Sequence, residues 1–249
     1  MLIKKQSIFI MKKHIKFLKF ILVGLLICSC SDDDDDGKPV EIATPGAFAY
    51  LETRTISVFD VDAALNVDLF TKNDLSFETL SVENNGTKVA DVAIDGATGT
   101  FNSSSLLPFE FGDDDKPTGA FNLDFIYSLS DGASFASKNQ NLEVTKAISL
   151  SNEVNSYIIN DTLNTSIVYA LNTKEATVDD VIVTYKVGSE GMEVTIDDRD
   201  FNVKKDSINF KDGAYRNYNL TVGDTLFYKF TATSGTLTDS VETSVVFTP

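Results

Sequence analysis

The sequence contains no tryptophan, one histidine and two cysteines among its 249 residues. The histidine is His14, and the cysteines are Cys28 and Cys30, so all three lie at the N-terminal end. If that end is a targeting segment cut before Cys30, and if Cys30 is acylated, the mature chain has neither a histidine nor a free thiol. Such a chain cannot build a Ser-His-Asp or Cys-His catalytic site. It also lacks soft ligands for zinc, copper or iron. We therefore predict that the protein is not an enzyme and needs no metal or cofactor.

The N-terminal segment has the organisation of a signal peptide, predicted over residues 1–29. Six lysines precede an apolar stretch at residues 20–27 that is much shorter than the ~20 apolar residues needed to cross a bilayer. The sequence Ile27-Cys28-Ser29-Cys30 resembles the lipobox of bacterial lipoproteins. That resemblance implies cleavage before Cys30 and attachment of the anchoring lipid to its sulfur.

An acidic segment follows the lipobox directly: Ser31, Asp32, Asp33, Asp34, Asp35, Asp36. Five adjacent like charges cannot pack, which predicts a disordered, solvated linker over residues 30–44. The same residues resemble the export signal of Bacteroidota-type surface lipoproteins. That resemblance implies a protein that is lipid-anchored in the outer membrane and exposed at the cell surface, with the membrane as its first partner.

The mature chain is strongly acidic. From Cys30 onward it holds 15 basic and 37 acidic residues, a net charge of −22. A chain of this charge repels phosphate backbones, so we expect no nucleic-acid partner. It would avoid anionic lipid for the same reason and would depend on its anchor.

Residues after about 45 alternate between apolar and polar with a period of two, which is typical of antiparallel sheets with one buried face. The clearest case is Phe121, Leu123, Phe125, Tyr127 and Leu129. Residues 65–70 resemble residues 163–168, and residues 125–132 resemble residues 228–235. We predict an all-β chain with two immunoglobulin-like antiparallel β-sandwich modules in tandem, over residues 45–140 and 141–249. The modules are either duplicates or unrelated β-modules of similar size.

Residues 220–232 resemble the turn and strand entry of fibronectin type III domains. Gly223 fits that pattern, but Leu226 stands where the family has a tyrosine, and the family's core tryptophan is missing. The resemblance implies a sandwich fold and no particular activity.

Three acidic loops contain possible oxygen ligands for Ca²⁺. They hold Asp60 and Asp62; Asp113, Asp114 and Asp115; and Asp197, Asp198 and Asp200. None matches a specific calcium-loop spacing, and the alternative is solvated charge in an acidic protein, so we predict no metal site. A pair of carboxylates could also hydrolyse glycosides, which leaves a carboxylate-based glycoside hydrolase as a remote alternative.

Tyr215 and Tyr218 lie in a polar turn and are the best candidates for exposed rings that could stack on a ligand; the alternative is corner packing with bonded hydroxyls. Four Asp-Ser/Thr-aliphatic sequences resemble acceptors of Bacteroidota O-glycosylation. Their hydroxyls belong to Thr162, Ser207, Thr225 and Ser240.

Together these features predict a non-catalytic surface lipoprotein. The first hypothesis is a binding or accessory component of outer-membrane uptake of glycans or peptides, with a glycan or protein ligand. The second is a structural or adhesion protein of the envelope.

Overall fold

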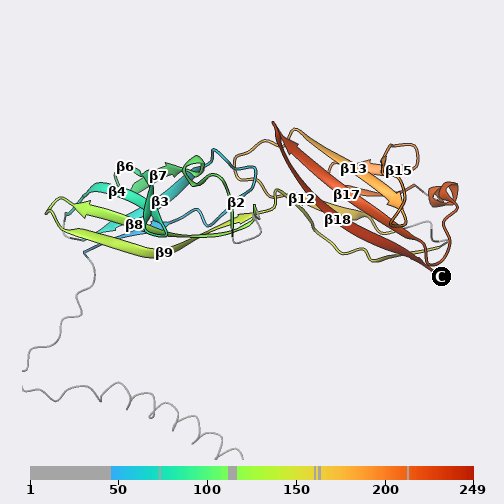
Figure 1. The fold of residues 1–249 in the computed structure, drawn as a ribbon, viewed down its shortest axis with the longest axis horizontal. Coiled ribbons are helices and arrows are strands. Elements are labelled where there is room, and N and C mark those ends of the chain that lie inside the picture. The colour runs from blue at the N-terminus through green and yellow to red at the C-terminus, as the bar shows by residue number, and fades with distance from the viewer. Residues whose placement is uncertain (1–45, 73, 112–116, 160, 162–163, 212) are drawn as a thin grey trace, which may run out of the picture. The chain divides into compact units, whose positions relative to one another are not determined.

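The computed structural model describes residues 46–249, except for residues 73, 112–116, 160, 162–163 and 212. The described residues contain no α-helix and form four sheets in two modules (Figure 1), antiparallel except for one parallel pair of strands in each module, which confirms the predicted all-β, immunoglobulin-like fold class. No helix among them is long and apolar enough to cross a membrane. The predicted signal peptide and acidic linker lie outside the described residues.

The first module consists of two sheets and one short 3₁₀ helix, η1 (Ser103–Leu106). One sheet, in spatial order, contains β1 (Ala47–Leu51), β3 (Ala64–Thr71), β7 (Thr98–Asn102) and β6 (Ala93–Asp95). The other contains β2 (Thr55–Ser57), β9 (Ser134–Thr145), β8 (Gly119–Leu129), β4 (Phe77–Asn84) and β5 (Thr87–Asp91). All neighbours are antiparallel except β2 and β9, which run parallel. The chain therefore changes sheets between β1 and β2.

The second module repeats this topology strand for strand. One sheet contains β10 (Ile148–Leu150), β12 (Ile167–Leu171), β16 (Ser207–Phe210) and β15 (Phe201–Lys204). The other contains β11 (Ser156–Ile158), β18 (Leu237–Thr248), β17 (Thr225–Ser234), β13 (Asp180–Val187) and β14 (Val194–Thr195). The parallel pair is β11 with β18, and a 3₁₀ helix, η2 (Ala214–Tyr218), follows β16 as η1 follows β7. Two similar modules were predicted, and their strand orders are the same.

The chain passes from the first module to the second after β9. This strand pairs with β8 as far as Val144, and the second module begins with β10 at Ile148. Residues 141–145 thus belong to the first module, slightly beyond the division expected at residue 140.

The alternating sequences fill the two cores. All five apolar residues predicted to share one face of β8 are buried. In β17 the residues Leu226, Tyr228, Phe230 and Ala232 are buried in the same way. Successive strand residues point to opposite faces, so each strand contributes every second side chain to the space between its two sheets.

The outer edge of β1 is closed by polar side chains from the opposite sheet. Ser137 Oγ accepts from the N–H of Ala49 at 2.9 Å, and Gln140 Oε1 accepts from the N–H of Leu51 at 3.3 Å. The Tyr127 hydroxyl donates to the carbonyl of Ala47 at 2.8 Å. An unpaired strand edge invites association with other chains, and these side chains remove that opportunity here.

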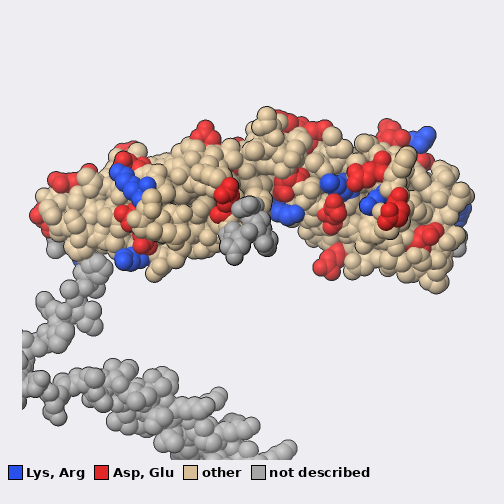
Figure 2. Space-filling model, viewed as in Figure 1, with Lys and Arg blue, Asp and Glu red and all other residues tan. Residues whose placement is uncertain are grey.

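Acidic side chains are spread over the visible face of both modules, with few basic side chains between them (Figure 2). This distribution follows from the composition, which has 37 acidic and 21 basic residues in the whole sequence. A surface of this kind favours solubility and discourages self-association.

Candidate functional site: the junction between the modules

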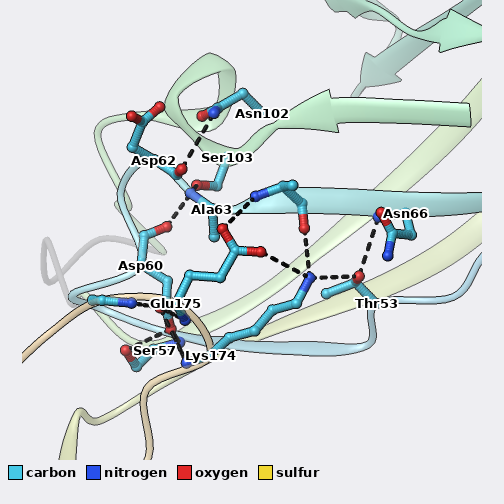
Figure 3. Close-up of polar contacts among 12 residues, drawn as sticks. Thr53, Ser57, Asp60, Asp62, Ala63, Asn66, Asn102, Ser103, Lys174 and Glu175 are labelled. Carbon is cyan, nitrogen blue, oxygen red and sulfur yellow. Dashed lines mark hydrogen bonds and ion pairs between the residues drawn. The ribbon is translucent and has the colours of Figure 1, made fainter.

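The most elaborate polar site among the described residues is built around Asp60, in the loop that follows β2 (Figure 3). The loop folds back on the end of the strand. Asp60 N–H donates to the carbonyl of Ser57 at 3.0 Å, while Asp60 Oδ2 accepts from both the N–H and the hydroxyl of Ser57 at 2.8 Å. These contacts resemble the reciprocal bonds of a capping box and fix the direction of the carboxylate. The side chain is left 1% exposed.

Three consecutive N–H groups of the second module converge on this carboxylate. Oδ1 accepts from Glu175 and Ala176 at 2.9 Å and from Lys174 at 3.1 Å, and Oδ2 accepts from Lys174 at 3.0 Å. Successive N–H groups that point to one side form a concave anion-binding site. The first module therefore supplies the anion, and the loop between β12 and β13 supplies the donors.

Burial and hydrogen bonding have opposite effects on Asp60. Burial by itself raises the pKa of the carboxyl, but the N–H groups of Lys174, Ala176, Glu175 and Ser57 favour the charged form. Together they outweigh burial, and the pKa of Asp60 lies below its ordinary value of 3.8. The carboxylate is thus charged at neutral pH, and the junction is formed by a fully bonded buried anion.

The side chains of the donor loop reach back to the first module. Lys174 Nζ donates to Thr53 Oγ1 at 3.1 Å and also to the carbonyl of Ala64. Glu175 Oε2 accepts from the N–H of Ala64 at 3.2 Å. The other carboxylate oxygen of Glu175, Oε1, forms an ion pair with Lys174 Nζ at 3.8 Å. The junction therefore has contacts in both directions, with Ala64 bonded through both its N–H and its carbonyl.

The Asp60 loop is also fixed from within the first module. The fully buried Ser103 donates from its hydroxyl to the carbonyl of Asp60 at 2.6 Å and accepts from the N–H of Ala63 at 2.8 Å. The neighbouring Phe59 is 3% exposed and belongs to the hydrophobic core of the second module. A charged contact and an apolar contact, one residue apart, thus join the two modules.

In the described part of the chain, Asp60 and Asp62 of the first acidic loop do not share a cation site. Asp60 is enclosed by donors, which is the opposite of what a cation needs. Asp62 is exposed, and its carbonyl accepts from Asn102 Nδ2 at 3.3 Å. Asp113, Asp114 and Asp115 lie outside the described residues. Within the described part of the chain, no group of three or more His, Cys, Asp or Glu side chains is placed to hold a metal ion.

Asp200 differs from its exposed neighbours Asp197 and Asp198, because it is 6% exposed and organises the far end of the second module. Its Oδ2 accepts from the Tyr218 hydroxyl at 2.8 Å, and its Oδ1 accepts from Asn217 Nδ2 at 3.0 Å. The hydrogen bond from Tyr218 lowers the pKa of Asp200, and Asn217 and Arg199 contribute to the same effect. Together they outweigh burial, which by itself raises this pKa. Burial, with Tyr185 and Asp200 nearby, raises the pKa of Tyr218 well above its usual range.

The expectation that Tyr215 and Tyr218 present exposed rings to a ligand is not met by their positions. Tyr215 is 3% exposed and packs against Phe247, with ring centroids 5.7 Å apart. Tyr218 is half-buried, and its ring lies edge-on to Tyr185 at 5.5 Å. The 3₁₀ helix η2 turns both rings toward the core, as in the packing part of the corner-packing alternative. The bonded hydroxyls of that alternative are not both present: the Tyr218 hydroxyl donates to the Asp200 side chain, and the Tyr215 hydroxyl is buried without a partner among the described residues.

The predicted glycosylation acceptors lie in different surroundings. Ser207 is buried and Thr225 and Ser240 are half-buried within strands, while Thr162 is outside the described residues. Two of the aspartates that precede them have structural contacts. Asp224 Oδ2 accepts from the N–H of Thr221 at 2.6 Å, and Asp239 Oδ2 accepts from the N–H of Ala147 at 2.7 Å. Cys30, Ser31 and Asp32–Asp36 lie outside the described residues.

The junction was missed in the sequence, although half of its signal is visible there. The spacing Ser57-x-x-Asp60 is typical of a side chain that binds local N–H groups. Nothing in residues 174–176 marks them as donors, because every residue except proline has a backbone N–H.

No protein-family model matches the sequence, and no curated protein matches it. The fibronectin(III)-like modules of Clostridium thermocellum CbhA are similar at 12% identity over 81% of this chain and 94% of that chain, with a TM-score of 0.27. The titin structure A168169 is similar at 13% identity over 81% and 99%, with a TM-score of 0.28. Extracellular domains 3–5 of Drosophila OTK are similar at 12% identity over 80% and 64%, with a TM-score of 0.27. These similarities concern the fold alone.

Proposed function

We propose that the chain is a non-catalytic, lipid-anchored surface protein of the bacterial envelope, and that its two joined modules act as a structural or adhesion spacer. The observation that carries this proposal is the Asp60 junction. Two modules joined only by a flexible linker would move independently, which is the usual expectation for neighbouring domains. A buried anion bonded across the junction by three N–H groups restrains that motion.

The uptake hypothesis stays a prediction. It rests on the anchor and the modules and not on a recognised site, and the buried ring of Tyr215 gives it no added support. The spacer role needs no ligand pocket. It needs modules that keep their mutual orientation and an anchor that holds them at the membrane.

The anchor is tested by replacing the cysteine that would carry the lipid. In the native host, Cys30→Ala is expected to move the protein from the membrane fraction to the soluble fraction. Replacing Asp32–Asp36 with alanine is expected to keep it in the membrane fraction but to protect it from protease added to intact cells. A Cys30→Ala protein that stays with the membranes would show that the anchor is wrong, and unchanged digestion would remove the surface location.

The spacer role is tested by a distance distribution between the modules. A Cys30→Ala chain has no thiol after residue 30, so spin labels can be placed at Lys138→Cys in the first module and Met192→Cys in the second. Both positions are exposed, and the pair is expected to give one narrow distance distribution. The same pair in an Asp60→Ala background is expected to give a broader one. A broad distribution in the parent chain would contradict a spacer.

A further inference from the structure

Exposed aromatic rings are gathered in one region of the described structure. Phe48 is 39% exposed, Tyr50 38%, Phe70 56% and Phe135 37%. All four belong to the first module, and no aromatic ring among the described residues of the second module is exposed to this degree. Two modules of equal topology thus differ in this respect, so the fold by itself does not require the cluster.

Three of the rings, Phe48, Tyr50 and Phe70, lie on one face of the β1–β3 pair, and Phe135 belongs to β9 in the other sheet. Phe48 lies directly opposite Phe70 across the β1–β3 pair, and its ring centroid is 6.3 Å from that of Tyr50. Phe135 packs on Tyr127 at 6.1 Å, and the Tyr127 hydroxyl binds the carbonyl of Ala47, the first residue of β1. We call Phe48, Tyr50, Phe70 and Phe135 the aromatic end of the first module.

The aromatic end is where the N-terminal part of the chain joins the fold. The described chain begins at Gly46, whose carbonyl accepts from the N–H of Lys72 at 2.9 Å, just beyond the end of β3. The junction contacts Ala64 at the other end of the same strand, an eight-residue strand. Between Cys30 and Phe48 a fully extended chain spans at most about 60 Å. A lipid on Cys30 would tether the fold through the segment that enters it at Gly46, two residues before Phe48.

Exposed aromatic rings in this position suit a lipid surface. Tyr50 has the amphipathic ring that favours the headgroup level of a bilayer, the apolar phenylalanine rings suit the boundary between headgroups and acyl chains, and lipid anchors gain stability from a second contact. The net charge of the mature chain argues against an attraction based on basic residues and against pairing of two copies through this end. The guanidinium of Arg54 lies 4.3 Å from the centre of the Tyr50 ring and brings a cation to the edge of the apolar cluster.

We propose that the aromatic end is a membrane-contact surface, which inserts its rings at the headgroup level of the bilayer that holds the anchor. This inference rests on the proposed lipid anchor and adds a second contact to it. Its consequence is orientation, because a protein held both by Cys30 and by the aromatic end would direct its second module away from the membrane.

The test uses the mature chain with Cys30→Ala, which carries no attached lipid, and vesicles of phosphatidylcholine, which have no net charge. Binding to these vesicles therefore depends neither on the anchor nor on charge attraction. Co-flotation with vesicles is expected for this chain. Phe48→Ser with Phe70→Ser is expected to lower the partition coefficient about tenfold, since each exposed ring contributes part of the transfer free energy of a phenylalanine. Phe70→Ser alone, at the most exposed ring, is expected to give an intermediate loss.

A matched control replaces two exposed apolar residues of the second module, Ile158→Ser with Ile182→Ser, whose exposures of 54% and 43% are similar. This control is expected to leave vesicle binding unchanged. Absence of flotation in the parent chain, or equal losses in both double variants, would overturn the membrane-contact surface. Neither result would affect the spacer proposal, which depends on fractionation and on the label distances.

Discussion

Replacing Asp60 with alanine is expected to lower the free energy of unfolding by about 3 to 5 kcal/mol, because several N–H groups lose a charged acceptor and each buried group left unsatisfied costs about 1 to 3 kcal/mol. The substitution leaves the N–H groups of Lys174, Glu175 and Ala176 without their acceptor in a buried place. Asp60→Asn keeps the side-chain volume but turns one acceptor into a donor that faces other donors, so a loss is expected there too. Urea unfolding of the Cys30→Ala chain measures both.

The control for this experiment is Asp62→Ala, in the same loop. Asp62 is exposed, so its replacement is expected to change stability by no more than about 0.5 kcal/mol. Hydrogen exchange gives a local readout, because the amides of residues 174–176 should exchange faster in Asp60→Ala while those of β8 should not. Equal stability of the Asp60→Ala and Asp62→Ala proteins would contradict the role assigned to the junction.

Acid provides an independent check of the same carboxylate. The pKa of Asp60 is lower in the folded protein than its ordinary value of 3.8, so the unfolded chain takes up the proton more readily. The contribution of Asp60 is therefore complete above pH 3.8 and is lost as the pH falls through the folded value. The stability difference between the parent and Asp60→Ala should be constant near neutral pH and shrink in that acid range.

A buried carboxylate is an unusual choice for joining two modules, because an apolar contact avoids the cost of removing a charge from water. The two kinds of contact differ in how strongly they depend on direction. Apolar side chains can slide over one another, whereas Asp60 accepts only from N–H groups that converge at the right angle. The three donors come from consecutive residues, so the orientation of the whole loop is tied to the anion. This property suits a spacer better than it suits a flexible tether.

Alternation in the sequence predicted the buried faces of the long strands. The five buried residues of β8 and the four of β17 follow a strict period of two. Such a period indicates a strand with one buried face and one exposed face. The sheets to which the strands belong could not be predicted in the same way. The change of sheet between β1 and β2 depends on side-chain bonds from Ser137 and Gln140, which in the sequence are only polar interruptions of a strand.

The candidate site was harder to predict for a physical reason. Asp60 and Lys174 are separated by 114 residues, and the donors are backbone groups without a sequence signature. The burial of Tyr215 was hidden by its polar neighbours, because a short 3₁₀ helix directs the ring inward while Arg216 and Asn217 remain exposed. The sequence draws attention to acidic and aromatic residues in loops, but their partners are visible only in the fold.

Phe59→Ala is expected to destabilise the second module by about 3 to 5 kcal/mol. This is expected although Phe59 lies between β2 and β3, two strands of the first module. Phe59 is 3% exposed and packs in the same core cluster as Tyr169, Phe230 and Phe247. Removing its ring leaves a cavity there, and the surrounding strands can only partly close it. The expected signature is faster hydrogen exchange in β12 and β17, with smaller changes in β8. Phe48→Ala, at an exposed ring of the first module, is the control and is expected to leave exchange in both modules unchanged.

If Phe59→Ala instead loosened only the first module, the two cores would be independent. The junction would then consist of the Asp60 contacts alone, which would have to hold the modules against every bending motion. With Phe59 in place, bending must break both a buried anion site and an apolar contact one residue away, so Asp60→Ala and Phe59→Ala are each expected to leave one of the two contacts in place.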